Sequence, residues 1–169
     1  MSIRTVSCLS FTPTATADTT NLADATHLSI QGSTATERIV LQELYIGGQA
    51  PSASSPMWMV LARHTTFGAG TVTLGTNARD AATDATSATG TARGYSAVVT
   101  TKPQRSATQA LLVPTFNAFG GNFKWQPSGV PGKDISLVSA TQPLGEFGLS
   151  QFTGGTAALI GAHMIYEVI

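Results

Sequence analysis

Charged side chains are scarce in this sequence of 169 residues. They make up 11% of the chain, against about 25% in an average soluble domain. Nine basic and nine acidic residues cancel to a formal net charge of zero, so little electrostatic repulsion keeps copies of the chain apart. The chain also lacks the local surplus of Lys and Arg that contact with nucleic-acid phosphates requires. We therefore expect a subunit of an assembly, with no direct nucleic-acid partner.

Cysteine and long apolar runs are also lacking. Cys8 is the only cysteine, which excludes a disulfide within the chain. No apolar run reaches the roughly 18 residues that span a bilayer, and the first residues, "MSIRTVSCLSF", have no apolar signal-peptide core. We expect a chain that is made and folded in a cytoplasm and that has no membrane partner.

Sequence patterns typical of metal sites and of catalytic sites are missing too. The three histidines, His27, His64 and His163, show no spacing such as H-x-H that would bring two of them to one metal ion. There is no G-x-S-x-G segment for a nucleophilic serine, and nothing in the sequence pairs two carboxylates. The sequence therefore predicts no metal, no cofactor and no enzymatic activity, and it predicts strand histidines held by ordinary hydrogen bonds.

What the sequence does have is short runs of β-branched and aromatic residues between clusters of Gly, Pro, Asn and Ser. No long window shows the apolar period of a helix. The pattern predicts one all-β domain over residues 1–169, a jelly-roll-like two-sheet β-sandwich with long loops and little helix. Strands are expected at residues 3–11, 27–32, 36–46, 57–65, 68–75, 95–101, 110–119, 122–126, 134–139, 146–152 and 157–169.

Two of these strands carry more specific expectations. The last strand, "GAHMIYEVI", is apolar to its end, so we expect it inside a sheet, paired with the first strand or beside it. Residues 36–46 carry apolar groups on both faces, which predicts a strand covered on both sides along part of its length. One expected face holds Val40, Gln42, Leu44 and Ile46, and the other holds Ile39, Leu41, Glu43 and Tyr45.

Residues 76–94 have almost no large apolar side chain and predict a long exposed loop, with one helical turn at residues 78–82. The segment carries Arg79, Asp80, Asp84 and Arg93. Two interpretations stay open with equal weight. The segment is either a solvated loop whose charges keep it soluble or an arm that reaches over a neighbouring subunit.

Aromatic residues gather in "FNAFGGNFKW", residues 116–125. The two glycines favour a hairpin with Phe119 and Asn122 on either side of the turn, which would set aromatic side chains opposite one another. Lys124 is the only basic residue in the segment, so a nucleic-acid stacking surface is not favoured. The segment predicts packing in the core or at a subunit interface.

Four segments, in order along the chain, resemble a known family. They are "TERIVLQELYIGG", "ARHTTFGAG", "FNAFGGNFKWQP" and "GLSQFTGGTAALIGAHMIYEVI". Together they look like small virion proteins of tailed bacteriophages, of the jelly-roll capsid decoration or cement type. The resemblance implies a homotrimer on the outside of the phage head that clamps neighbouring major capsid proteins. Its partners would be the major capsid protein and further copies of itself.

This resemblance places the chain on the capsid surface of a virion, after assembly in the host cytoplasm. The same features suit another all-β virion part, such as a tail or baseplate subunit. The alternative is a carbohydrate- or receptor-binding jelly-roll module of a phage tail or fibre, which would expose Trp58, Trp125 and Asn117. The candidate interface or packing residues are Phe116, Phe119, Phe123, Trp125, Trp58, Arg79, Asp80 and Arg93.

Overall fold

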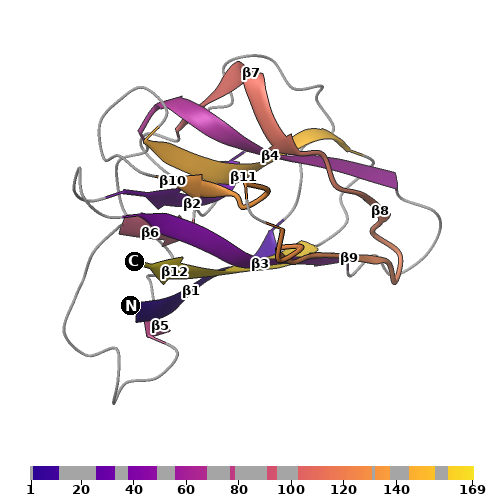
Figure 1. Cartoon of the computed structure of the whole chain (residues 1–169). Coiled ribbons are helices and arrows are strands. Elements are labelled where there is room, and N and C mark those ends of the chain that lie inside the picture. Colours follow the sequence, from indigo (N-terminus) through magenta and orange to yellow (C-terminus); the bar gives the residue numbers. More distant parts are fainter. Residues whose placement is uncertain are drawn as a thin grey trace.

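A computed structural model describes the chain at residues 2–11, 26–32, 38–48, 56–67, 77–78, 91–94, 103–130, 132–137, 145–154 and 160–169. Within these residues the chain forms strands and turns and no helix. The described residues therefore contain no helix that could cross a membrane. The strands make two antiparallel sheets that lie one above the other (Figure 1). The expected all-β sandwich is confirmed.

In Figure 1 the strands β1, β3, β9 and β12 of sheet A form the lower layer, and the last strand lies near the centre of the sheet. The strand order is β10-β3-β12-β1-β5, and β9 pairs with β3 beside β10. Because β12 pairs with both β1 and β3, the expected position of the C-terminal strand is confirmed. The strands are β1 (Ser2–Phe11), β3 (Ile39–Gly48), β5 (Asn77–Ala78), β9 (Asn122–Trp125), β10 (Ser136–Leu137) and β12 (Ile160–Val168).

Sheet B is the upper layer, with the strand order β6-β2-β11-β4-β7. The short strand β8 pairs with β4 at the end of β4 that β7 leaves unpaired. The strands are β2 (Thr26–Gln31), β4 (Pro56–Thr66), β6 (Thr91–Gly94), β7 (Gln104–Leu112), β8 (Thr115–Asn117) and β11 (Glu146–Gly154).

The pairing is nested along the chain. The strand β1 pairs with β12, β2 with β11, β3 with β9 and β10, and β4 with β7 and β8. Successive pairs fall alternately in sheet A and sheet B. The chain is therefore one long antiparallel ribbon folded back and forth between two layers, which is the topology of a jelly roll.

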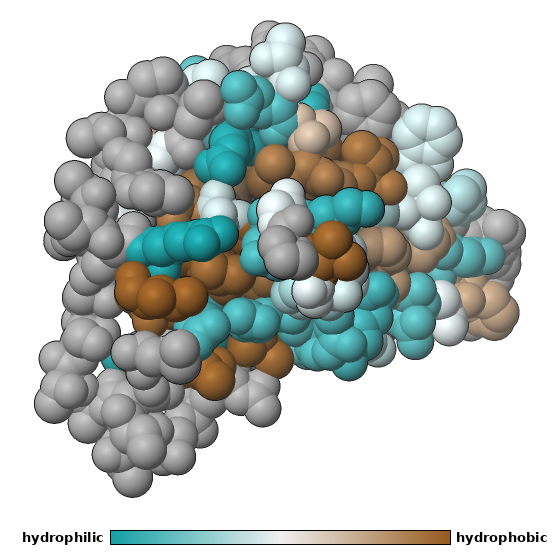
Figure 2. Space-filling view, in the orientation of Figure 1, coloured by the Kyte–Doolittle hydropathy of each residue, from teal (hydrophilic) through white to brown (hydrophobic). Residues whose placement is uncertain are grey.

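The core lies between the two layers, because side chains of a strand point alternately to its two faces. In β12 the buried side chains are those of Ile160, Ala162, Met164, Tyr166 and Val168, and the intervening ones are partly exposed. Tyr166 from sheet A and Phe147 from sheet B are the largest fully buried side chains. Figure 2 shows hydrophobic residues between the layers and a hydrophilic band below β3 and β9.

A β-bulge in β3 corrects the two faces expected for residues 36–46. Glu43 lies opposite Ile165 and Leu41 lies opposite Tyr166, so Gln42 is one extra residue on the β3 side. The bulge shifts the alternation by one position. The predicted assignment of residues to the two faces was therefore wrong. Ile39 and Leu41 were expected opposite Leu44 and Ile46, but all four belong to the buried core cluster. Val40 is buried as well, so this part of β3 is covered on both sides as expected.

The "FNAFGGNFKW" segment is a crossover between the sheets, and the hairpin prediction was wrong. Before the glycines, β8 pairs with β4 in sheet B; after them, β9 pairs with β3 in sheet A. A compact turn redirects the chain: Gly121 N donates to Asn117 O (2.8 Å), and Gly120 has φ of +68°. Each flanking strand thus pairs with a longer strand in its own sheet.

The two arms of the ribbon meet closely at this crossover. A Cβ atom on Gly48 would lie 2.2 Å from Ala118 O and 2.4 Å from Ala118 Cα, where no real Cβ fits. Gly48 N also donates to Gly121 O at 3.1 Å. The "YIGG" end of β3 and the "FNAFGG" turn therefore touch through backbone atoms, and this contact requires glycine at position 48.

Other expected elements differ in extent. Asn77–Ala78 and Thr91–Gly94 are strands, so the loop with a helical turn expected at residues 76–94 is corrected at both ends. The single strand expected at 110–119 is divided, because Pro114 has no N–H to continue a ladder; its carbonyl accepts from Met59 N instead. The strands expected at 68–75 and 95–101 lie outside the described residues.

Gly48→Ala is predicted to destabilise the fold by about 2–3 kcal/mol, as overpacking against rigid backbone does. Gly161→Ala is the matched control in β12, because a Cβ there has nothing within 4 Å; it should change stability by less than about 1 kcal/mol. Urea unfolding of the two variants measures the difference. Equal effects would contradict the close approach at Gly48.

Candidate functional site

The aromatic residues singled out in the sequence divide between the core and the surface. Phe116, Phe123 and Trp125 are partly buried and pack against the core cluster of their own chain. Phe123 lies opposite Ile46 and Trp125 opposite Leu44, so both face the interior of the sandwich. Trp58 and Phe119 are 47% and 51% exposed and are the two that remain available to a partner.

The structure describes only one of the three charged residues that the sequence offered as interface candidates. Arg79 and Asp80 lie outside the described residues, so the arm over a neighbouring subunit stays a prediction. Arg93 lies in the strand β6, opposite Ser29 of β2, and belongs to sheet B. The sequence had predicted that Arg93 lies in a loop, and this prediction was wrong.

An exposed surface without charge covers the β4–β8 end of sheet B. Trp58 lies opposite Thr115, and Pro56 lies opposite Asn117, so these four side chains share one face. Val113, 56% exposed, precedes them, and Phe119 follows, with its N–H bonded to Asn117 Oδ1 at 3.0 Å. We call this surface the corner patch; it comprises Pro56, Trp58, Val113, Thr115, Asn117 and Phe119.

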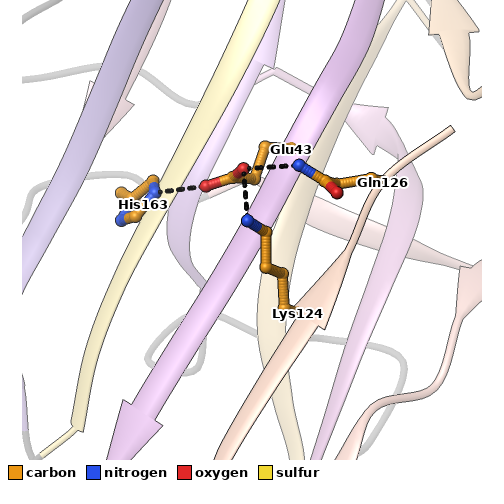
Figure 3. Close-up of polar contacts among 4 residues, drawn as sticks. All are labelled: Glu43, Lys124, Gln126 and His163. Atoms are coloured by element: carbon orange, nitrogen blue, oxygen red, sulfur yellow. Dashed lines mark hydrogen bonds and ion pairs between the residues drawn. The ribbon is translucent and has the colours of Figure 1, made fainter.

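A polar cluster lies on the outer face of sheet A, centred on Glu43 (Figure 3). Lys124 Nζ lies 3.1 Å from Glu43 Oε2, and Gln126 Nε2 donates to the same oxygen at 2.9 Å. His163 Nε2 lies 3.1 Å from Glu43 Oε1. The His163 ring stacks on Tyr45, with centroids 5.3 Å apart and planes 16° apart. The strand β12, the strand β9 and the residue that follows β9 thus send side chains to one carboxylate on β3.

The contacts of Glu43 lower the pKa of its carboxyl group below the ordinary 4.5. The hydrogen bond with His163 contributes most, followed by the hydrogen bond with Lys124. Both carboxylate oxygens already accept hydrogen bonds from protein donors, so the group is held in its charged form and in one position. Its physical role is to join β3, β9 and β12 across the outer face of sheet A.

A second polar pair is completely buried in sheet B. His64 Nδ1 lies 3.2 Å from Glu146 Oε1, and both side chains have 0% exposure. The His64 ring lies above Gly148, where a Cβ would come within 2.6 Å of the ring. Arg105 of β7 lies opposite His64, and Gln31 of β2 lies opposite Glu146. A row of polar residues therefore crosses four strands of the sheet.

These clusters hold strands together, and neither has the composition of a metal centre. No group of three or more His, Cys, Asp or Glu side chains within the described ranges is placed to bind a metal ion. His64 and His163 are strand histidines with hydrogen bonds to Glu146 and Glu43, as expected from the sequence. The sequence did not reveal the two glutamate partners, because each lies far from its histidine along the chain.

Comparison with known proteins adds little. No family model matches the chain, and no curated protein matches it. One compared structure is the crystal structure of the infectious bursal disease virus VP2 subviral particle, with 14% sequence identity. The match covers 99% of this chain, which spans 41% of that chain, and the TM-score is 0.15. A score this low carries no argument about fold or function.

Glu43→Gln is predicted to change how stability depends on pH. A carboxyl pKa that is lower in the folded than in the unfolded state stabilises the fold above the ordinary value, and this contribution is lost as the pH falls through the lowered value. Wild type should therefore lose stability below about pH 4.5 more steeply than Glu43→Gln does. Thermal unfolding between pH 3 and pH 7 measures the slopes. Glu167→Gln is the control, because Glu167 is another carboxylate of sheet A, which accepts from Gln42 at 2.9 Å; an equal change of slope in both variants would contradict the prediction.

His64→Leu is predicted to destabilise the protein by about 3–5 kcal/mol, because it leaves the buried Glu146 carboxylate without its imidazole partner. His163→Leu, the control on the exposed face, should cost about 1 kcal/mol or less. Adding Glu146→Leu to His64→Leu should recover a large part of the loss, since it also removes the buried carboxyl group. Chemical denaturation of the four proteins tests this; no recovery in the double variant would argue against the pair.

Proposed function

We propose that this chain is a structural virion protein, a decoration or cement protein that binds the outside of a phage head. In this role it bridges neighbouring major capsid subunits, works as a homo-oligomer and carries out no reaction. The family resemblance of the four sequence segments suggests this role, and the resemblance also suggests a trimer. The sandwich topology is compatible with it but is shared by many unrelated functions.

The corner patch is the observation that carries the proposed role in contacts between subunits of an assembly. Trp58, Val113 and Phe119 are 47%, 56% and 51% exposed; Trp58 lies on β4 opposite β8, and Val113 and Phe119 lie two residues before and after β8. Aromatic side chains fixed on a rigid sheet are typical anchors of protein–protein contacts. A protein that works by binding other proteins requires such an exposed apolar surface. Packing within the single chain does not explain why these side chains are exposed.

The state of the polar groups supports a role without catalysis. Glu43 has both oxygens engaged by neighbouring side chains, and His64 and Glu146 are inaccessible to solvent. A general acid or base needs to reach a substrate proton. The two His–Glu contacts in the described residues are therefore better explained as links between strands, which strengthen a sandwich that resists internal pressure in a capsid.

A glycan-binding module of a tail or fibre is the second candidate. Trp58 and Asn117 are both exposed and lie on neighbouring rungs of one face, and a ring beside an amide suits a sugar. Trp125, the third residue expected at such a site, faces the core in sheet A instead. The three residues therefore do not form one surface, and this leaves the glycan site with two of its expected members.

Co-sedimentation with undecorated phage capsids tests the proposed function. The purified chain should pellet with capsids to a saturating level and should raise the temperature at which the capsids release DNA. Multivalent contact predicts that binding by an oligomer exceeds that of a monomeric variant by 10²-fold or more, roughly. A chain that stays in the supernatant and is retained on a glycan array would overturn the proposal in favour of the second candidate.

A further inference from the structure

The corner patch combines exposed apolar side chains with a lack of charged ones. Three of the six large apolar side chains that are well exposed in the described part of the chain lie in it. The residues between them are Pro56, Thr115 and Asn117, so the patch contains no charged side chain. Scattered exposed apolar residues need no explanation, but a contiguous group of them indicates an interaction surface.

The absence of charge decides which partner fits. A charged surface laid on this patch would lose its hydration and gain no opposite charge in return. A second copy of the chain presents the same uncharged residues, and a net charge of zero gives two copies no long-range repulsion. We propose that the corner patch is a contact between two copies of this chain, with Trp58 and Phe119 as its anchors.

The backbone beneath the patch is already fixed in the single chain. Met59 N donates to Pro114 O at 2.9 Å, which attaches the segment before β8 to β4. Gly121 N donates to Asn117 O, and Asn117 Oδ1 accepts from Phe119 N. Because these bonds order the anchors before contact, association loses less conformational entropy. The patch is therefore prepared for a partner in a way that a loose loop is not.

This inference builds on the proposed self-association and is independent of capsid binding. Oligomer mass is measured in solution without capsids, whereas the proposed function is measured by pelleting with them. A chain that forms oligomers through the patch but ignores capsids would support the inference and contradict the head-decoration role. A chain that pellets with capsids as a monomer would do the reverse.

The first experiment compares oligomer mass by light scattering for wild type, Trp58→Thr, Phe119→Ser and Ile3→Thr. Trp58→Thr should weaken association by about 30-fold or more, the loss typical of an interface anchor. Ile3→Thr is the matched control, an exposed apolar residue (42%) on β1 of the other sheet; it should keep the wild-type mass. Monomeric wild type, or equal loss in Trp58→Thr and Ile3→Thr, would overturn the inference.

The second experiment removes no apolar side chain and so avoids effects on folding. Thr115 is exposed and opposite Trp58, and Thr115→Lys or Thr115→Glu places like charges against each other in a contact between copies. Each variant alone should be monomeric, and an equal mixture of the two should recover the wild-type mass. Unchanged mass in both single variants, or a mixture that stays monomeric, would contradict the inference.

Discussion

The close backbone contact between Gly48 and Ala118 is the constraint on which the rest of the arrangement depends. At this point β3 of sheet A ends on one arm of the ribbon, and on the other arm the chain passes from β8 in sheet B to β9 in sheet A. A side chain at position 48 would force the arms apart. The contact therefore fixes how closely the arms approach; next to it, Phe123 and Trp125 pack on the core and Trp58 is exposed.

The two sheets use their few charged residues differently. In sheet A the charges lie on an outer face that is open to solvent, and one carboxylate gathers donors from two neighbouring strands (Figure 3). In sheet B the pair His64 and Glu146 is buried, where a broken partnership is far more costly than at the surface. The corner patch lies at the end of sheet B and has no charge at all. The molecule thus separates polar links between strands from the surface that is suited to contact.

Period-two patterns and turn residues were sufficient to predict the fold class, most strands and the pairing of the first strand with the last. They could not reveal the bulge at Gln42, because the sequence on both sides of it still alternates. They also misjudged Gly120 and Gly121, since a pair of glycines suits a hairpin as well as a crossover and only the partners β3 and β4 distinguish the two. Trp58 was identified as a candidate, but Glu43 and Glu146 were not, because their histidine partners lie 120 and 82 residues away.

The position of β12 has a consequence for the order in which the chain can fold. This strand separates β1 from β3 in sheet A, and these two strands have no direct pairing with each other. While a ribosome is still making residues 160–168, the earlier strands of that layer expose unpaired edges and an apolar surface. Closure of the layer must wait for almost the whole described sequence, and contacts between such distant segments form slowly. A newly made chain is therefore most prone to aggregate just before its last strand emerges.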